Sequence, residues 1–188
     1  MKLNEIKNKK IRILDATAGF RGIWFDKNEE HTIYIDIRPE TNPDYVMDCT
    51  KTNFPDKFFN LIVFDPPHIG TTPNNKGIMG KRYHGGLRTS EIRELIKKAF
   101  KEFYRILKDD GFVLFKWNNH DQKLPKILSL IENFKPLFGQ KVSVSTKHVS
   151  RTYWVCLIKK RLDTCQLPPA KTGSLQVFKG GKNERKNN

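Results

Sequence analysis

The chain has 188 residues and a formal net charge of +15 at pH 7, and 37% of its residues are hydrophobic, enough for one domain with a buried core. No apolar run is long enough to span a bilayer, the first ten residues contain no apolar signal segment, and the three cysteines form neither a CxxC pair nor an even framework. We therefore expect a cytoplasmic protein without membrane association. The positive charge favours a polyanionic partner such as nucleic acid, although a highly charged surface can also serve solubility alone.

Four predicted strands come first, and an aspartate stands at or near the end of each. The strands are 10–16, 31–37, 44–50 and 60–65, and the aspartates are Asp15, Asp36, Asp48 and Asp65. One aspartate after a strand is usually a turn former. Ligands of parallel sheets lie outside the carboxyl ends of the strands, so four aspartates in succession predict a polar site at that edge.

The segment after the fourth strand, residues 69–88, is rich in glycine and basic side chains and predicts a long loop. We interpret it as a lid over the substrate or as a solvated loop. Within 89–111, apolar residues at helical spacing predict a helix, and 111–117 predicts a fifth strand.

The last part of the predicted domain holds a helix at 124–134 with proline near its start, and then an antiparallel hairpin from 140–147 and 151–160. The remaining residues, 163–188, have few apolar side chains and predict a flexible basic tail behind a domain that spans 1–162. Strands that alternate with helices indicate an α/β fold with a mostly parallel sheet and helices on both faces.

Several motifs within 10–160 together resemble those of class I S-adenosylmethionine-dependent methyltransferases. The segment LDATAGFRG resembles the acid-then-glycine loop under the methionine part of the cofactor, DI resembles the acid that binds the ribose hydroxyls, and MDCT stands where the family contacts adenine. The resemblance implies a Rossmann-like seven-stranded sheet with a C-terminal antiparallel hairpin, and S-adenosyl-L-methionine as cofactor. The binding residues that it implies are Asp15, Ala16, Thr17, Gly19, Asp36, Ile37, Asp48 and Cys49.

The segment DPPH, residues 65–68, resembles the (D/N/S)PP(Y/F/W) motif of enzymes that methylate exocyclic amino nitrogens in nucleic acids. Together with WFDK, FKWN and YW-C--K it resembles small phage- and prophage-encoded proteins labelled as DNA methyltransferases. Two departures stand out: the glycine loop lacks G-x-G, and histidine replaces the usual aromatic residue. The resemblance implies adenine N6 as the first choice of target and cytosine N4 as the second.

The chemistry of the motif supports the same assignment. An exocyclic amine that attacks a methyl group gains positive charge, so two acceptors aimed at its N–H bonds would help. Asp65 offers a carboxylate and Pro66 a backbone carbonyl, whose direction Pro66 and Pro67 fix because their φ angles are locked. The flat ring of His68 can stack on the base. We therefore predict these four residues as the catalytic group.

A second group is predicted to contact the substrate, and the sequence leaves its chemistry open. Its members are Lys81, Arg82, Tyr83 and Lys116. Lys116 ends the fifth predicted strand and could bind a phosphate, but ribose 2′-O-methyltransferases also place a lysine there, beside an acid. Against that alternative, the final strands offer Lys147 without the glutamate that such enzymes need.

Two further alternatives concern the class of protein. A catalytically silent relative that only binds nucleic acid (DNA or RNA) would keep the same fold, whereas a nicotinamide-dependent dehydrogenase is disfavoured because the glycine spacing fails. The histidines show no metal-ligand spacing, and we expect no metal. No separate block of sequence is left for reading a target, so specificity would come from 69–88 or from a protein partner.

Overall fold

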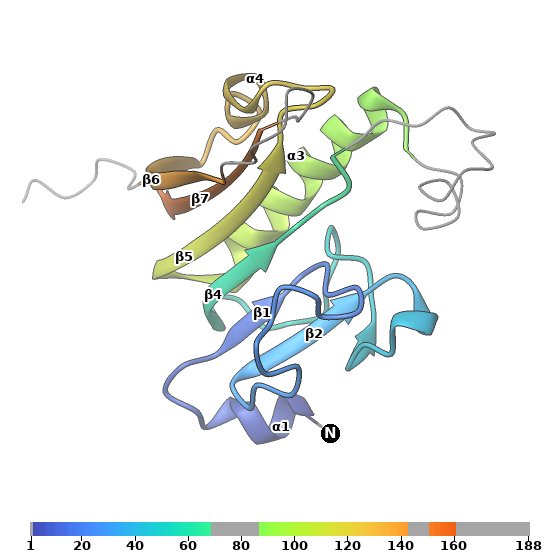
Figure 1. Cartoon of the computed structure of the whole chain (residues 1–188). Coiled ribbons are helices and arrows are strands. Elements are labelled where there is room, and N and C mark those ends of the chain that lie inside the picture. Colours follow the sequence, from blue (N-terminus) through green and yellow to red (C-terminus); the bar gives the residue numbers. More distant parts are fainter. Residues whose placement is uncertain (1, 69–86, 143–150, 161–188) are drawn as a thin grey trace, which may run out of the picture.

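The computed structural model describes residues 2–68, 87–142 and 151–160. These residues form one seven-stranded sheet with helices packed against it (Figure 1). The elements in chain order are α1 (Lys2–Lys7), β1 (Ile13–Asp15), β2 (Thr32–Asp36), the 3-10 turn η1 (Pro39–Thr41), β3 (Tyr45–Val46), β4 (Phe59–Phe64), α3 (Thr89–Ile106), β5 (Leu107–Asn118), α4 (Leu124–Leu128), β6 (Phe134–Val142) and β7 (Thr152–Lys159).

The strand order is β3-β2-β1-β4-β5-β7-β6. The five strands from β3 to β5 pair in parallel, whereas β7 pairs antiparallel with both β5 and β6. This arrangement confirms the predicted fold class, a mostly parallel sheet with a C-terminal antiparallel hairpin. The carboxyl ends of β1, β2, β4 and β5 therefore meet at one edge of the sheet.

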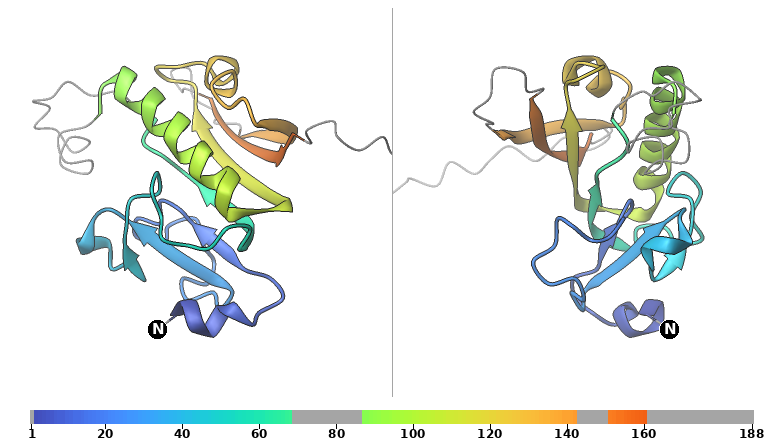
Figure 2. Two further views of the ribbon diagram at one scale, coloured as in Figure 1. Left: turned by 180° about the vertical axis from the view of Figure 1, so that it is seen from behind. Right: turned by 45° about the vertical axis from the view of Figure 1, so that its right-hand side comes forward.

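Helix α3 covers one face of β4 and β5, as Figure 2 shows from behind. The contact is aromatic: Phe64 packs against Phe103 with ring centroids 4.9 Å apart and stacks on Phe115 at 5.9 Å, and Phe115 in turn stacks on Trp117 at 5.7 Å. All four side chains are fully buried. Burial of such rings supplies roughly 2–3 kcal/mol each, so this cluster fixes how α3 sits on the sheet.

Two elements near the C-terminus have boundaries that differ from those predicted from the sequence. The helix predicted over 124–134 ends at Leu128, and the first hairpin strand begins at Phe134 instead of residue 140. Phe134 is buried and packs edge-on against Phe100, with ring centroids 5.3 Å apart. The strand therefore begins at this residue, before the position that the local pattern indicates. Pro136 is accommodated because β6 is an edge strand.

Turns alone form the connection between β1 and β2, residues 16–31, where no helix occurs. Arg21 holds this connection: its guanidinium donates to the carbonyls of Lys27 at 2.6 Å and Asn42 at 3.1 Å, and lies 4.0 Å from the ring centroid of Tyr34. Trp24 packs edge-on against the same tyrosine ring at 5.3 Å. Side-chain contacts therefore replace the hydrogen-bond ladder that a helix would supply.

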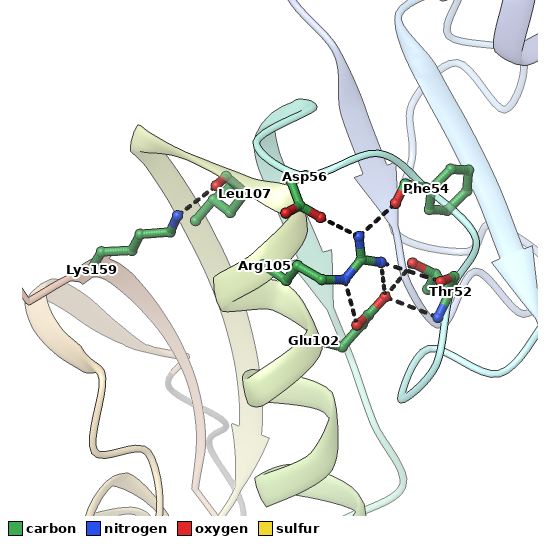
Figure 3. Close-up of polar contacts among 7 residues, drawn as sticks. All are labelled: Thr52, Phe54, Asp56, Glu102, Arg105, Leu107 and Lys159. Carbon is green, nitrogen blue, oxygen red and sulfur yellow. Dashed lines mark hydrogen bonds and ion pairs between the residues drawn. The ribbon is translucent and has the colours of Figure 1, made fainter.

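Arg105 on α3 anchors the segment between β3 and β4 (Figure 3). Its guanidinium donates to the carbonyls of Thr52 and Phe54 and to the carboxylates of Asp56 and Glu102. Glu102 also accepts from the amide and hydroxyl of Thr52 at 2.9 and 2.6 Å. Burial alone would raise the pKa of Glu102, but the bonds from Arg105 and Thr52 outweigh it and lower the pKa.

At the start of β5, the buried Lys159 donates to the carbonyl of Leu107 at 2.6 Å (Figure 3). Gly111 follows in the same strand, and a Cβ there would come within 2.7 Å of the Leu107 side chain and 2.9 Å of the Asn60 carbonyl. Only glycine fits this close approach between β4 and β5.

Some of the sequence-based predictions fall outside the described residues. These are residues 69–86 of the predicted loop, residues 143–150, and the tail from 161 onward, which includes the predicted domain boundary at 162. Among the residues that are described, no helix combines the length and the apolar character needed to cross a bilayer.

We predict that Arg105→Met lowers the free energy of unfolding by about 2 kcal/mol, because the change leaves Glu102 half-buried without its cation and frees two carbonyls. Urea unfolding measures the effect. The matched control is Lys97→Met on the same helix, where the exposed ion pair with Glu94 contributes no more than about 0.5 kcal/mol. Equal stability of the two variants would contradict the anchoring role.

Candidate functional site

A cleft of about 880 Å³ lies at the carboxyl ends of the parallel strands. One wall comes from the turn after β1 and the residues that follow β2 and β3, and the opposite wall comes from the end of β4, Lys116 of β5 and the first half of α3. Most of the residues predicted from the sequence line this cleft: Ala16, Thr17, Gly19, Asp36, Ile37, Asp48, Cys49, Asp65, Pro67, His68 and Lys116.

Five predicted site residues do not line the cleft or lie outside the described residues. Asp15 and Pro66 are buried beneath its surface. Lys81, Arg82 and Tyr83 lie outside the described residues, and their predicted contact with the substrate stays a prediction.

The two sides of the cleft are joined through the turn after β1. The amide of Asp65 donates to the hydroxyl of Thr17 at 2.9 Å, the amide of Ala16 donates to the Val63 carbonyl at 2.9 Å, and the amide of Ala18 donates to the Ile35 carbonyl at 3.0 Å. The turn is therefore fixed to the strands on both sides of β1.

Asp15 is 1% exposed and is held within the protein. One carboxylate oxygen accepts from the indole N–H of Trp24 at 2.6 Å, and the other accepts from the amide of Thr17 at 3.2 Å. Burial raises the pKa of Asp15 to about 6, although both hydrogen bonds act in the opposite direction. Asp15 thus links the β1 turn to the 16–31 connection and does not face the cleft.

Asp36 lines the cleft, yet its carboxylate is already hydrogen-bonded. Oδ1 accepts from the backbone amide and the Nε of Arg38, both at 3.0 Å. Oδ2 accepts from the amide of Gly19 at 2.8 Å and from Nη2 of Arg38 at 3.1 Å. Burial acts to raise the pKa of Asp36, but these bonds outweigh it, and its pKa lies below the usual value.

The third strand end supplies one exposed acid and one buried thiol. Asp48 accepts from the amide of Thr50 at 2.8 Å, which closes a turn, and it is one of the residues that line the cleft. Cys49 is 5% exposed, and burial raises the pKa of its thiol to about 12, so it remains protonated and acts as a small apolar wall.

Asp65 forms an ion pair with Lys116 across the ends of β4 and β5. The Nζ–Oδ2 distance is 2.7 Å, and the two side chains are 23% and 25% exposed. The ammonium also lies 5.7 Å from the ring centroid of Trp154. Lys116 therefore contacts the predicted catalytic carboxylate itself, a contact that the phosphate interpretation of the sequence did not include.

His68 is held by the motif to which it belongs. Its Nδ1 lies 3.2 Å from the carbonyl oxygen of Pro66, a distance that suits an Nδ1–H donor, and its ring lies edge-on to Trp117 at 6.3 Å. Burial lowers the pKa of His68 below its ordinary value, so the imidazole is neutral at pH 7. A neutral ring of fixed orientation suits stacking.

The sequence did not predict several residues of the site. Arg38 reaches Asp36, and Trp24 reaches Asp15, from flanking turns. In the sequence, Arg38 directly follows the DI segment and Trp24 opens the WFDK segment. The α3 side of the cleft was missed as well; it contributes Ser90, Glu91, Glu94, Leu95 and Lys98. No group of three or more potential metal ligands occurs in the part of the chain that the structure describes.

No family model matches the chain, and no curated protein matches it at a significant level. Solved structures do match. A protein from Pyrococcus horikoshii superposes with a TM-score of 0.54 at 14% identity, over 85% of this chain and 90% of that one. A TehB-like SAM-dependent methyltransferase from Corynebacterium glutamicum gives 0.52 at 17% identity, over 85% of each chain.

A SAM-dependent methyltransferase from Methanosarcina mazei also matches, with a TM-score of 0.52 at 13% identity over 79% of this chain and 92% of that one. At these identities the likeness concerns the fold. The chain has the Rossmann-like fold of these methyltransferases, with the antiparallel hairpin at the C-terminal end of the sheet.

The raised pKa of Asp15 predicts a pH-dependent stability. The native state holds this proton up to about pH 6, whereas the unfolded chain releases it near pH 3.8. The stabilising contribution is therefore complete below pH 3.8 and lost as the pH rises through 6, a change of roughly 2–3 kcal/mol. Asp15→Asn keeps an acceptor for Trp24 and lacks this dependence.

Relative to the natural protein, Asp15→Asn should therefore gain stability between pH 4 and pH 7. Urea unfolding at both pH values measures it. A stability difference that stays the same at the two pH values would show that Asp15 does not bind its proton in the native state.

Proposed function

We propose that the chain is an S-adenosyl-L-methionine-dependent methyltransferase that acts on an exocyclic amino group of a nucleic-acid base, with adenine N6 ahead of cytosine N4. The observation that carries the proposal is the DPPH turn. Its residues Asp65, Pro67 and His68 line the same cleft as Asp36 and Ile37. The fold of the solved methyltransferases supports the general reaction, and the net charge of +15 supports a nucleic-acid partner.

The lining of the cleft fits the proposed cofactor. Ile37, Met47, Cys49 and Leu95 give apolar walls for a purine, and Asp36 adds a carboxylate to the same lining, as a ribose diol requires. Gly19 has φ +49, and its amide points to Asp36, which keeps the backbone close to the floor of the cleft. When bound, S-adenosyl-L-methionine supplies an electrophilic methyl group.

Two acceptors in the DPPH turn would bind the reacting amine. Lys116 contacts Oδ2 of Asp65, and no described residue donates to Oδ1, so this oxygen can accept one N–H of the amine. The Pro66 carbonyl would accept the other N–H through the lone pair that His68 does not use. Because Pro66 is buried and does not line the cleft, the base must enter the DPPH turn to reach this oxygen. The proline φ angles hold this carbonyl without reorganisation.

The remaining groups orient the base and receive the proton. His68, neutral and held edge-on to Trp117, offers a flat surface to the base. Because attack precedes loss of the proton, Asp65 acts first as an acceptor and afterwards receives the proton, directly or through water. Positioning of the amine in line with the methyl group is the main contribution.

The ion pair between Lys116 and Asp65 favours a second candidate, methylation of a ribose 2′-hydroxyl in RNA. A lysine 2.7 Å from an acid could hold and help to deprotonate a hydroxyl. A ribose site would also need a second lysine and a glutamate. Among the described residues that line the cleft, the remaining residues of these types are Lys98, Glu91 and Glu94, all on α3. The amine reaction needs no group beyond those in the DPPH turn and remains the first proposal.

Nucleoside mass spectrometry of DNA and RNA treated with the protein and S-adenosyl-L-methionine tests the proposal. We expect N6-methyladenine or N4-methylcytosine. Asp65→Ala should lower turnover by about 10²–10³-fold while cofactor binding persists, because one preorganised acceptor is lost from the transition state.

Lys116→Met separates the two candidates. In the amine reaction its loss leaves Asp65 less well oriented and should lower single-turnover methylation of DNA less than the loss of Asp65 does. In the ribose reaction Lys116→Met should stop chemistry as completely as Asp65→Ala does, and only RNA should accept the methyl group. The matched control is Lys126→Met on α4, which removes an equal charge away from the cleft. Methylation of DNA, which lacks the 2′-hydroxyl, eliminates the ribose reaction.

Asp36 tests the cofactor site separately. Asp36→Ala should weaken S-adenosyl-L-methionine binding by roughly 1.5–3 kcal/mol, since charge-assisted hydrogen bonds to the ribose are lost. Titration calorimetry gives the affinity, and circular dichroism shows whether the variant is folded. An unchanged affinity in a folded variant would remove Asp36 from the binding site.

A further inference from the structure

The carboxylate of Asp36 has no acceptor position left for a ribose. Four donors contact it, two on each oxygen, at distances from 2.8 to 3.1 Å. An ionised carboxylate has about four lone-pair sites. The acid that the proposed function assigns to the ribose diol is therefore saturated by the protein itself.

The four donors fall into two kinds. The amides of Gly19 and Arg38 belong to the main chain, and each donates to a different oxygen of the carboxylate. The other two donors, Nε and Nη2, belong to the Arg38 side chain, and each contacts a different oxygen. The side chain thus occupies one acceptor position on each oxygen, and a pair of ribose hydroxyls requires the same number of positions.

The Arg38 side chain also stands in the space of the ligand. It lines the cleft, and its Nη2 lies 3.4 Å from the position that a Cβ on Gly19 would take. Its side chain is only 16% exposed. A nucleoside cannot reach Asp36 while the guanidinium remains there.

We propose that Arg38 is a placeholder on Asp36, which the ribose of the bound nucleoside displaces. This inference rests on the proposed function, because it takes the ligand of Asp36 to be a ribose diol. Before binding, the guanidinium fills the acceptor position on each oxygen that the main-chain amides leave open in a carboxylate that is almost fully buried. On binding, two hydroxyl donors replace two N–H donors, while the main-chain amides keep the carboxylate in place.

The placeholder has a consequence for affinity. Part of the free energy of nucleoside binding is used to separate a bidentate arginine–carboxylate pair, a strong form of charge-assisted hydrogen bond. Removal of the side chain abolishes this competition and leaves Asp36 with two unused acceptors. Arg38→Met should therefore bind adenosine about tenfold more tightly than the natural protein does.

The experiment is titration calorimetry with neutral probes, so that removal of a positive charge has no direct Coulombic effect on the ligand. Adenosine carries both hydroxyls, and 2′-deoxyadenosine lacks one. The increase in affinity from Arg38→Met should be about tenfold for adenosine and clearly smaller for 2′-deoxyadenosine, which can replace only one of the two N–H donors.

Arg21→Met is the matched control. Arg21 also pairs with a half-buried aspartate, Asp44, at 3.5 Å, and supports the same 16–31 connection, but it does not line the cleft. Its loss should not raise adenosine affinity, because it loosens the connection that carries Gly19 without freeing any acceptor on Asp36. If Arg21→Met raised the adenosine affinity as much as Arg38→Met does, the cause would be a loosened 16–31 connection, and the proposal that Arg38 is a placeholder would be wrong.

The remaining outcomes separate this inference from the proposed function. If the natural protein binds adenosine and Arg38→Met binds it equally or more weakly, Arg38 supports Asp36 and the placeholder is wrong, while the proposed function stands. If neither protein binds adenosine or S-adenosylhomocysteine and both are folded by circular dichroism, the proposed function itself fails, and the placeholder fails with it.

Discussion

The register between β4 and β5 is the constraint on which the site depends. Phe64 and Phe115 are directly paired across the two strands and are both buried under α3. Asp65 and Lys116, one residue further along each strand, are thereby brought side by side. An ion pair of this exposure contributes about 1 kcal/mol or less, whereas each buried ring contributes roughly 2–3 kcal/mol. The aromatic core sets the geometry, and the ion pair follows from it.

The parts of this arrangement that follow from local pattern could be predicted from the sequence. Alternating or continuous apolar runs located the strands of the parallel sheet, and helical spacing located α3. The acids after the strands then indicated the edge that carries the cleft. The boundaries failed where a distant contact overrides the local pattern: Phe134 belongs to β6 because it packs on Phe100 of α3, a contact that nothing within 124–134 reveals.

The roles of the individual acids could not be predicted, because their environments are set by residues far away or on neighbouring turns. Trp24 turns Asp15 into a buried link, Arg38 covers Asp36, and Lys116 pairs with Asp65. In the sequence the acids look equivalent, since each follows a predicted strand. In the structure burial raises the pKa of Asp15, hydrogen bonds lower that of Asp36, and the two acids consequently serve different purposes.

The absence of a helix between β1 and β2 has a consequence for motion. The backbone of residues 16–31 is held by scattered turn bonds, such as Arg21 to Ala18 at 2.8 Å, and by the side chains of Arg21 and Trp24. Such a segment opens locally at a lower free energy than the sheet does, so its amide hydrogens exchange with solvent sooner than those of β4. A ligand that contacts Gly19 binds only when this segment is in its folded position, so the bound ligand slows the exchange of the amide hydrogens of the segment. Ligand binding in the cleft and the ordering of residues 16–31 are thereby coupled.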